Sequence, residues 1–486
     1  MSSHAPDLLV IGGGPAGVTA ALRARELGAS VALVERGPFG GTCTNDGCVP
    51  TRVLAHAARL VRDASQYERF GLRGEPPVVD FPRLLARVRE VVEHMHEKKQ
   101  LRAHLEAMEI AVFDGRGAAH FVDSHTIALD DGSRLSAERI IIAAGGHARR
   151  LDLPGVELAL THSDVWNLSR LPRSIAIVGG AATGCQLASI FAAFGTRVHL
   201  IEVGPRLLGG EDEDISAAIA QAFADRGIQM TTGISGLERI ERLGSGELRL
   251  SYRQDGETRA TEAEAVLLAV GWPANLEGLG LEAAGIAVER GHIRTDDALR
   301  TSVPHIFAAG DITGRMMLVQ SAAAEGALAA ENAVLAGADP GRHRIVPHGG
   351  FTDPEYGSVG LSEAQARAAG DYVAATVPYA QIDRALIDDH TEGFCKLIVS
   401  VETHHLLGAQ VVGEQAVEVL QLIAAGMSAD IHIEQLADLE LAYPTYASIV
   451  GLAARQITRD LGVVPVAAPW RSLAAHGLAE WERRDA

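Results

Sequence analysis

The chain has 486 residues, with 43 Lys and Arg against 62 Asp and Glu, and its formal net charge is −19. An acidic chain of this length has room for about three domains and offers no general attraction for nucleic acid or anionic membranes. No apolar run reaches the ~18–20 residues that span a bilayer. The N-terminus shows no secretion signal, and four Cys are too few for a disulfide framework. We therefore expect a cytoplasmic enzyme without nucleic-acid or membrane partners.

Near the N-terminus, residues 8–35 have the pattern of a dinucleotide-binding unit: a strand, a glycine-rich turn, a helix and a second strand that ends in an acid. Gly12 permits the tight turn, Gly14 allows a pyrophosphate to approach the backbone, and Gly17 allows helix and strand to pack closely. Glu35, at the end of the second strand, is expected to bind adenosine ribose hydroxyls. The alternation of strands and helices along the chain predicts an α/β fold.

Two cysteines five positions apart, Cys43 and Cys48, follow in a stretch that is predicted to begin a helix. A helix N-terminus stabilises a thiolate, which is the species that exchanges with disulfides. A zinc site would need a second pair of ligands, but Cys185 and Cys395 are single and distant. These two lie in apolar contexts and are predicted to be buried and inert. We therefore expect a redox-active cysteine pair and no metal site.

Residues 175–202 repeat the pattern of the first unit with the same spacing from first glycine to terminal acid. Ala181 occupies the second glycine position of the motif, which narrows the approach to the backbone without abolishing it. Glu202 would hydrogen-bond a ribose 2′-hydroxyl and repel a 2′-phosphate, so NADH is expected over NADPH. Arg206 weakens this preference because it could reach a phosphate. The glycines that the motif retains are Gly179, Gly180 and Gly184.

The rest of the chain contains one more strand-to-helix junction and then changes character. Residues 301–311 are predicted to form a strand that ends in Gly-Asp, and Asp311 by itself is best interpreted as a helix cap. Past residue 345 the pattern favours an antiparallel α+β arrangement. We expect strands at residues 351–359, 394–401 and 409–412, helices at 362–369 and 413–425, and a short terminal helix within 467–486.

These motifs together resemble the FAD-dependent pyridine nucleotide–disulfide oxidoreductases of the dihydrolipoamide dehydrogenase, glutathione reductase and mercuric reductase group. The resemblance extends from about residue 6 to 462. It rests on both glycine-rich turns, on Gly-Gly-Thr-Cys-x4-Cys, and on the segments at residues 141–145, 270–275, 309–311 and 351–355. It implies two Rossmann-like dinucleotide-binding domains and a C-terminal α+β dimerisation domain. The implied divisions are 1–155 with 272–345 for FAD, 156–271 for NAD, 346–465 for the interface, and 466–486 as a tail.

The resemblance also implies FAD and NADH as cofactors, a homodimer, and roles for individual residues. Cys48 would face the flavin as the charge-transfer thiolate, and Cys43 would exchange with substrate. Asp311 would bind the ribitol, and Gly117 would lie near the adenosine. Further FAD-binding residues implied by it are Gly12, Gly14, Gly17, Glu35, Gly41, Thr42, Arg52, Gly145 and Val319. The implied NAD-binding residues are Gly179, Gly180, Gly184, Gln186, Glu202, Ile234 and Gly271.

One departure from the family concerns the acid–base group. Disulfide-reducing members carry His-Pro-x-x-x-Glu, supplied by the partner subunit, whereas residues 443–448 here are Tyr-Pro-Thr-Tyr-Ala-Ser. A tyrosine with a pKa of ~10 is a poor base at neutral pH. Tyr443 could still donate a hydrogen bond or act as an acid, or it could simply pack. Mercuric reductases also lack the dyad but use a C-terminal Cys pair, and residues 462–486 contain no Cys. The same absence excludes a mechanism like that of thioredoxin reductases with a Cys or selenocysteine tail.

Other departures lie near the flavin and the cysteines. Arg52 replaces the family Lys, and Gln186 replaces the acid with which it pairs, so we expect an uncompensated positive charge that raises the flavin potential. A neutral covariation that preserves packing is the alternative. Asp46 replaces an apolar residue and either opposes thiolate formation at Cys43 or is solvated with little effect. Trp272 stands where the family often has Arg and either stacks on the cofactor or packs.

The sequence therefore predicts a homodimeric, NADH-dependent flavoprotein that passes electrons through FAD to the Cys43–Cys48 disulfide. The expected final acceptor is a small-molecule disulfide, as for dihydrolipoamide dehydrogenase. Tyr443 and Arg52 are added to the two cysteines as candidate catalytic residues. The first alternative is a metal-ion or quinone and oxidant reductase like mercuric reductase. The second is a redox sensor or a flavin subunit of a larger complex.

Overall fold

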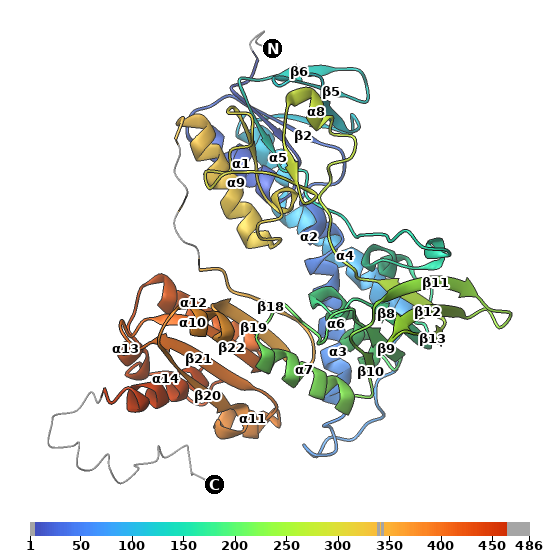
Figure 1. Cartoon of the computed structure of the whole chain (residues 1–486), viewed down its shortest axis with the longest axis vertical. Coiled ribbons are helices and arrows are strands. Elements are labelled where there is room, and N and C mark those ends of the chain that lie inside the picture. Colours follow the sequence, from blue (N-terminus) through green and yellow to red (C-terminus); the bar gives the residue numbers. More distant parts are fainter. Residues whose placement is uncertain (1–4, 338–340, 342–344, 464–486) are drawn as a thin grey trace.

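The computed structural model describes residues 5–337, 341 and 345–463, and Figure 1 shows its three sheet-centred layers. The first two lie along the upper and right parts of the view, and the third lies at the lower left. No helix among the described residues is both long and apolar enough to cross a membrane. The terminal helix expected within residues 467–486 falls outside the described residues.

The first sheet is five-stranded and parallel, in the order β17-β7-β1-β2-β3. Alternate side chains of a strand point to opposite faces. One face of β1 therefore packs under α1, α5 and α9, while the other faces a small antiparallel sheet, β4-β5-β6. The elements are β1 (Leu8–Ile11), α1 (Pro15–Glu26), β2 (Val31–Glu35), α5 (Leu101–Ala107), β3 (Ala111–Asp114), β4 (Ala119–Phe121), β5 (Thr126–Leu129), β6 (Arg134–Ser136), β7 (Arg139–Ile142), β17 (Ile306–Ala308) and α9 (Val319–Val334).

The second sheet repeats this construction with four parallel strands in the order β10-β9-β8-β14. Its β8–α6–β9 path matches β1–α1–β2, which confirms the predicted duplication. A three-stranded antiparallel sheet, β11-β12-β13, covers one face. The elements are β8 (Ser174–Val178), α6 (Ala182–Ala193), β9 (Arg197–Ile201), α7 (Glu213–Asp225), β10 (Gln229–Thr231), β11 (Gly236–Arg242), β12 (Leu248–Gln254), β13 (Glu257–Ala263) and β14 (Ala265–Leu268).

The third sheet is antiparallel throughout, in the order β18-β19-β22-β21-β20, as the change of pattern after residue 345 predicts. The strand expected at 351–359 begins only at Glu355, directly after Pro354, which has no N–H to donate to a ladder. The helix expected at 413–425 begins at Ala416. The elements are β18 (His348–Gly350), β19 (Glu355–Gly360), α10 (Glu363–Ala369), β20 (Tyr372–Pro378), η4 (Tyr379–Gln381), α11 (Asp383–Asp388), β21 (Phe394–Ser400), β22 (Leu406–Gly413), α12 (Ala416–Ser428), α13 (Ile433–Ala437) and α14 (Ser448–Asp460).

Helix α3 joins the three layers. It starts beside the first sheet and buries Leu54 and Ala58 in a core shared with Phe191 of α6 and Tyr356 of β19. The remaining elements are α2 (Gly41–Asn45), α3 (Cys48–Ala64), α4 (Phe81–Lys99), η1 (Val156–Leu158), η2 (His162–Asn167), α8 (Leu281–Ala284), β15 (Val288–Glu289), β16 (His292–Ile293) and η3 (Asp311–Thr313). The predicted domain boundaries at 155/156, 271/272 and 345/346 stay predictions.

Candidate active site

Cys43 and Cys48 lie where two helices meet, in residues 41–48, which we call the redox loop after their predicted role. Cys43 is on α2, and α3 begins at Cys48, so the predicted helix N-terminus is present. Both are thiols here, with Cys43 half-buried and Cys48 exposed. A hydrogen bond from the Cys43 thiol lowers the pKa of Cys48 to about 7. The same hydrogen bond, together with burial, raises the pKa of Cys43. The pair therefore favours a thiolate at Cys48 and a thiol at Cys43.

Both cysteines line a cavity of about 840 Å³ between the first two sheets. Its walls come from the glycine-rich turn after β1, the redox loop, the end of β7, the start of α6 and η3. The predicted site residues that line it are Gly12, Gly14, Glu35, Gly41, Thr42, Cys43, Cys48, Gly145, Gln186, Gly271, Asp311 and Val319. Those that do not line it are Gly17, Arg52, Gly117, Gly179, Gly180, Gly184, Glu202, Ile234 and Tyr443.

The first glycine-rich turn is as tightly packed as its spacing predicts. Gly12 has φ +112°, and a Cβ there would lie 2.3 Å from the carbonyl oxygen of Ala143. A Cβ on Gly17 would lie 1.8 Å from the carbonyl oxygen of Gly12. Gly14 precedes α1 and leaves the helix N-terminus open to the cavity. The carboxylate of Glu35 accepts hydrogen bonds from two backbone N–H groups, one of them in this turn. Its predicted contact with a ribose stays a prediction.

The second turn has the same geometry. A Cβ on Gly179 would lie 2.2 Å from the carbonyl oxygen of Ala269, and one on Gly184 would lie 1.8 Å from that of Gly179. Glu202 accepts backbone hydrogen bonds from the turn and from the loop that follows β9. The guanidinium of Arg206 donates to three backbone carbonyls of its own loop. The preference for NADH over NADPH stays a prediction.

Asp311 does not cap a helix. Gly310 precedes η3, Asp311 is its first residue, and no side chain caps it, so the cap interpretation is wrong. The carboxylate instead accepts a hydrogen bond of 2.9 Å from the indole N–H of Trp272. Burial raises the pKa of Asp311. Trp272, expected to stack or merely pack, thus holds a buried carboxylate at the cavity wall.

Arg52 is not an uncompensated charge, and this prediction is wrong. Its guanidinium forms an ion pair of 3.1 Å with Glu355 and lies 3.9 Å from the centre of the Phe351 ring. Gln186 instead accepts a hydrogen bond of 3.2 Å from the backbone N–H of Phe351. A carboxylate from the third sheet replaces the missing acid, so the argument for a raised flavin potential loses its premise. The pairing joins residues 303 positions apart, which spacing along the chain could not show.

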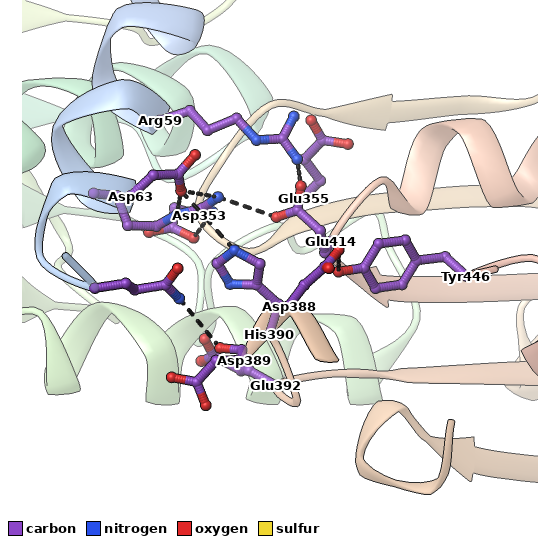
Figure 2. A network of polar contacts seen from close by, with 12 residues as sticks. Arg59, Asp63, Asp353, Glu355, Asp388, Asp389, His390, Glu392, Glu414 and Tyr446 are labelled. Atoms are coloured by element: carbon purple, nitrogen blue, oxygen red, sulfur yellow. Dashed lines mark hydrogen bonds and ion pairs between the residues drawn. The ribbon is translucent and has the colours of Figure 1, made fainter. Parts of the chain in front are cut away.

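Further along the same face of α3, a network of ion pairs ties this helix to the third sheet (Figure 2). Arg59 pairs with Glu414, and Arg62 pairs with Asp353 at 2.8 Å and with Glu414 at 3.1 Å. Burial would raise the pKa of Asp353, but the charges of Arg62 and Arg226 outweigh it and lower the pKa. We did not predict these residues from the sequence. Their spacing on one face of α3 was the available signal.

The carboxylate of Asp46 is held by residues of η2. It accepts hydrogen bonds of 2.5 Å from Ser163 and 2.8 Å from the indole N–H of Trp166, and it pairs with His162 at 3.3 Å. Burial would raise its pKa, but these hydrogen bonds lower it. The prediction that Asp46 is simply solvated is therefore wrong, because it tethers the redox loop to η2. Its predicted effect on the Cys43 thiolate stays a prediction.

Tyr443 lies on the third layer, outside the cavity. Its side chain is 57% exposed, and its hydroxyl donates a hydrogen bond to Asp383. It does not pack in the core of its own chain, and its role as an acid stays a prediction. Cys185 and Cys395 are fully buried, and burial raises the pKa of each thiol to about 12. The prediction that these two thiols are buried is confirmed, and their inertness stays a prediction.

The chain belongs to the pyridine nucleotide–disulphide oxidoreductase family. The model of this family matches residues 6–326, and the model of its dimerisation domain matches residues 346–454. Dihydrolipoyl dehydrogenase of Geobacillus stearothermophilus is 33% identical over 92% of this chain and 95% of its own. Mercuric reductase of Streptomyces lividans is 35% identical over 94% of this chain and 97% of its own. The predicted family is confirmed.

Solved structures show the same architecture. The HOCl-induced flavoprotein disulfide reductase RclA from Escherichia coli has a TM-score of 0.81 and 28% identity, over 93% of this chain and all of its own. LpdA from Mycobacterium tuberculosis has a TM-score of 0.83 and 28% identity, over 93% of this chain and 99% of its own. Together with the family models, these confirm the predicted fold class of two dinucleotide-binding units and a C-terminal dimerisation domain.

The residues present fit the FAD and pyridine nucleotide that the family binds. The turn at Gly12 and Gly17 has no room for a Cβ, and its helix N-terminus opens toward the cavity, which suits a pyrophosphate. The cavity, about 840 Å³ in volume, is lined by this turn, by Asp311 and by both cysteines. On the opposite wall, Gln186 and Gly271 belong to the second unit.

Proposed function

We propose that this protein is a homodimeric, NADH-dependent flavoprotein that reduces a small disulfide through the Cys43–Cys48 pair, acting in the cytoplasm. FAD bound in the cavity would supply two-electron transfer between the nicotinamide and the cysteines. The observation that carries the proposal is the coupled thiol pair at the start of α3, which lines the same cavity as both glycine-rich units.

The chain's own residues support different roles for the two thiols. Cys48 lies at a helix N-terminus, and its low pKa favours a thiolate at neutral pH. Cys43 retains the proton and would be the thiol that attacks an acceptor. Arg52, neutralised by Glu355 and seated on Phe351, would hold the first turn of α3 in position. Asp46 anchors the other end of the loop.

Counting thiols in the holoenzyme would test the proposal. After anaerobic incubation with or without NADH, the protein is denatured in an alkylating reagent and its modified cysteines are counted by mass. We expect two modified cysteines, Cys185 and Cys395, without NADH, and all four with it. A Cys48→Ser variant should show no such gain. Equal counts with and without NADH would refute a cysteine pair that accepts electrons from the nucleotide.

The acceptor is then identified by turnover with lipoamide, glutathione disulfide and Hg(II) in separate assays. We expect a disulfide to support NADH oxidation that depends on both cysteines. The second candidate, a metal-ion or oxidant reductase, is favoured by the exposed Tyr443 at the position where disulfide reductases carry His. It would be supported by turnover with Hg(II) or a quinone and none with any disulfide.

A further inference from the structure

The C-terminal end of α4 packs against the redox loop. The ammonium of Lys99 donates a hydrogen bond of 3.1 Å to the hydroxyl of Thr44, which is buried and directly follows Cys43. One turn earlier, Nε2 of His96 lies 2.7 Å from the side-chain oxygen of Asn45. Two successive residues of α2 are thus held by α4, which brings the Lys99 ammonium to Thr44, the residue that directly follows Cys43.

Lys99 is available to act on a ligand. Its residue is exposed, and no carboxylate of the described residues forms an ion pair with it. The hydrogen bond to Thr44 is to a neutral hydroxyl, so the positive charge beside Cys43 is not cancelled. The side chain of Cys48 raises the pKa of the Cys43 thiol, and the charge of Lys99 lowers it.

The cysteine pair requires a nearby positive charge to deprotonate Cys43 easily. Cys43 shares its proton with the Cys48 thiolate and must lose that proton before it can attack a disulfide. A second thiolate beside the first is unfavourable, because like charges repel. Lys99 opposes this effect by lowering the pKa of Cys43. In this chain Tyr443 occupies the position of the family His that normally assists the thiol. Lys99 of α4 would take over part of that task by stabilising the Cys43 thiolate from within the same chain.

We propose that Lys99 stabilises Cys43 as the attacking thiolate and selects an acceptor that carries a carboxylate near its disulfide. The part on the acceptor rests on the proposed function. In the reaction, Cys43 loses its proton to solvent and its sulfur bonds one sulfur of the acceptor, while the other sulfur leaves as a thiolate with the electron pair. Cys48 then attacks the Cys43 sulfur and restores the disulfide. The second acceptor sulfur leaves, and both products take protons from solvent.

Alkylation of the NADH-reduced holoenzyme tests the effect on Cys43 without any acceptor. Rates with iodoacetate, an anion, and iodoacetamide, which is neutral, are measured against pH and assigned to Cys43 by fragmentation of the modified peptide. In Lys99→Met we expect the iodoacetate-to-iodoacetamide ratio to fall about fivefold, as for loss of one nearby charge in a partly aqueous site. The pH midpoint of the reaction should also rise. Lys99→Arg should restore both.

Lys98, exposed and one residue earlier on α4, provides the matched control. Lys98→Met should leave the ratio and the midpoint unchanged. An unchanged ratio in Lys99→Met, or an equal fall in Lys98→Met, would overturn the proposal. Because Lys99→Met also removes the hydrogen bond to buried Thr44, its thermal midpoint is measured beside that of the wild type, and Lys99→Arg keeps a donor at this position.

Selectivity is tested with oxidised lipoate and lipoamide, which differ only in a carboxylate and an amide. We expect Lys99→Met to lower the ratio of kcat/KM for lipoate to that for lipoamide, with recovery in Lys99→Arg. A ratio independent of residue 99 would refute the selectivity. Absence of turnover with any disulfide would refute the proposed function instead, while the alkylation result would still decide the role of Lys99 at Cys43.

Discussion

The buried ion pairs of Lys396, which join the second and third layers, should contribute strongly to the free energy of unfolding. Its ammonium lies 2.7 Å from Asp212, 2.7 Å from Asp214 and 3.0 Å from Glu363, and the residue is 1% exposed. Lys396→Met replaces it with an apolar side chain of similar length. Asp212, which is also buried, would then lose its cationic partner and retain only backbone hydrogen bonds.

The expected cost follows from burial. Breaking a buried ion pair by removing one partner costs about 3–5 kcal/mol. The lower value applies here, because Asp212 keeps its backbone hydrogen bonds and the more exposed Asp214 and Glu363 can be solvated. At roughly 2 °C per kcal/mol, a loss of about 3 kcal/mol lowers the thermal midpoint by about 6 °C.

The pH dependence has a definite sign. Burial would raise the pKa of Asp212, but the hydrogen bond and charge of Lys396 together with two backbone hydrogen bonds lower it, and the hydrogen bond from Lys396 also lowers the pKa of Glu363. Carboxylates with lowered pKa values stabilise the fold above their unfolded values of about 4, and this contribution disappears as the pH falls through the folded values. The difference between wild type and Lys396→Met should therefore be large at neutral pH and smaller in acid.

Calorimetry of the holoenzyme at pH 7 and pH 4 measures both effects, with Lys98→Met as the exposed control. A midpoint for Lys396→Met within about 1 °C of wild type at pH 7 would contradict the argument, since surface substitutions change stability that little. A difference that grows in acid would contradict the assigned sign.

Three other predictions concern the site. Gly17→Ala should yield protein without bound FAD, because the new Cβ would lie 1.8 Å from a carbonyl oxygen. Gly184→Ala, which has the same clash in the second unit, should keep FAD and lose NADH oxidation, and flavin absorbance and turnover distinguish the two variants. Asp46→Val should lower the thermal midpoint by an amount equivalent to about 1–3 kcal/mol, because Ser163 and His162 lose their carboxylate partner while the indole N–H of Trp166 keeps only the backbone carbonyl of residue 46; a Val variant as stable as wild type would contradict this. Alkylation of Cys48 in reduced enzyme should be half-maximal near pH 7, its lowered pKa, and a midpoint near that of a free thiol would refute the coupling.

Local pattern was sufficient for the parts of the site whose function depends on the backbone. Gly12 and Gly184 lie in turns whose sterics involve residues close in sequence or on the next strand, so spacing alone predicted them. The helix start at Cys48 and the buried Cys185 were likewise readable from neighbouring residues. Family resemblance then predicted two dinucleotide-binding units and a C-terminal dimerisation domain, a fold class that the comparisons confirm.

The sequence by itself thus determined the fold class, the family and the position of the redox pair, because these depend on periodicity and on short motifs. Only the tertiary structure determined which partners the charged side chains have. Arg52 pairs with Glu355 across 303 positions, Asp46 bonds to η2, and Lys99 bonds to Thr44, next to Cys43, through the packing of α4. An ion pair depends on distance in space, and the chain brings distant residues together only when its layers pack.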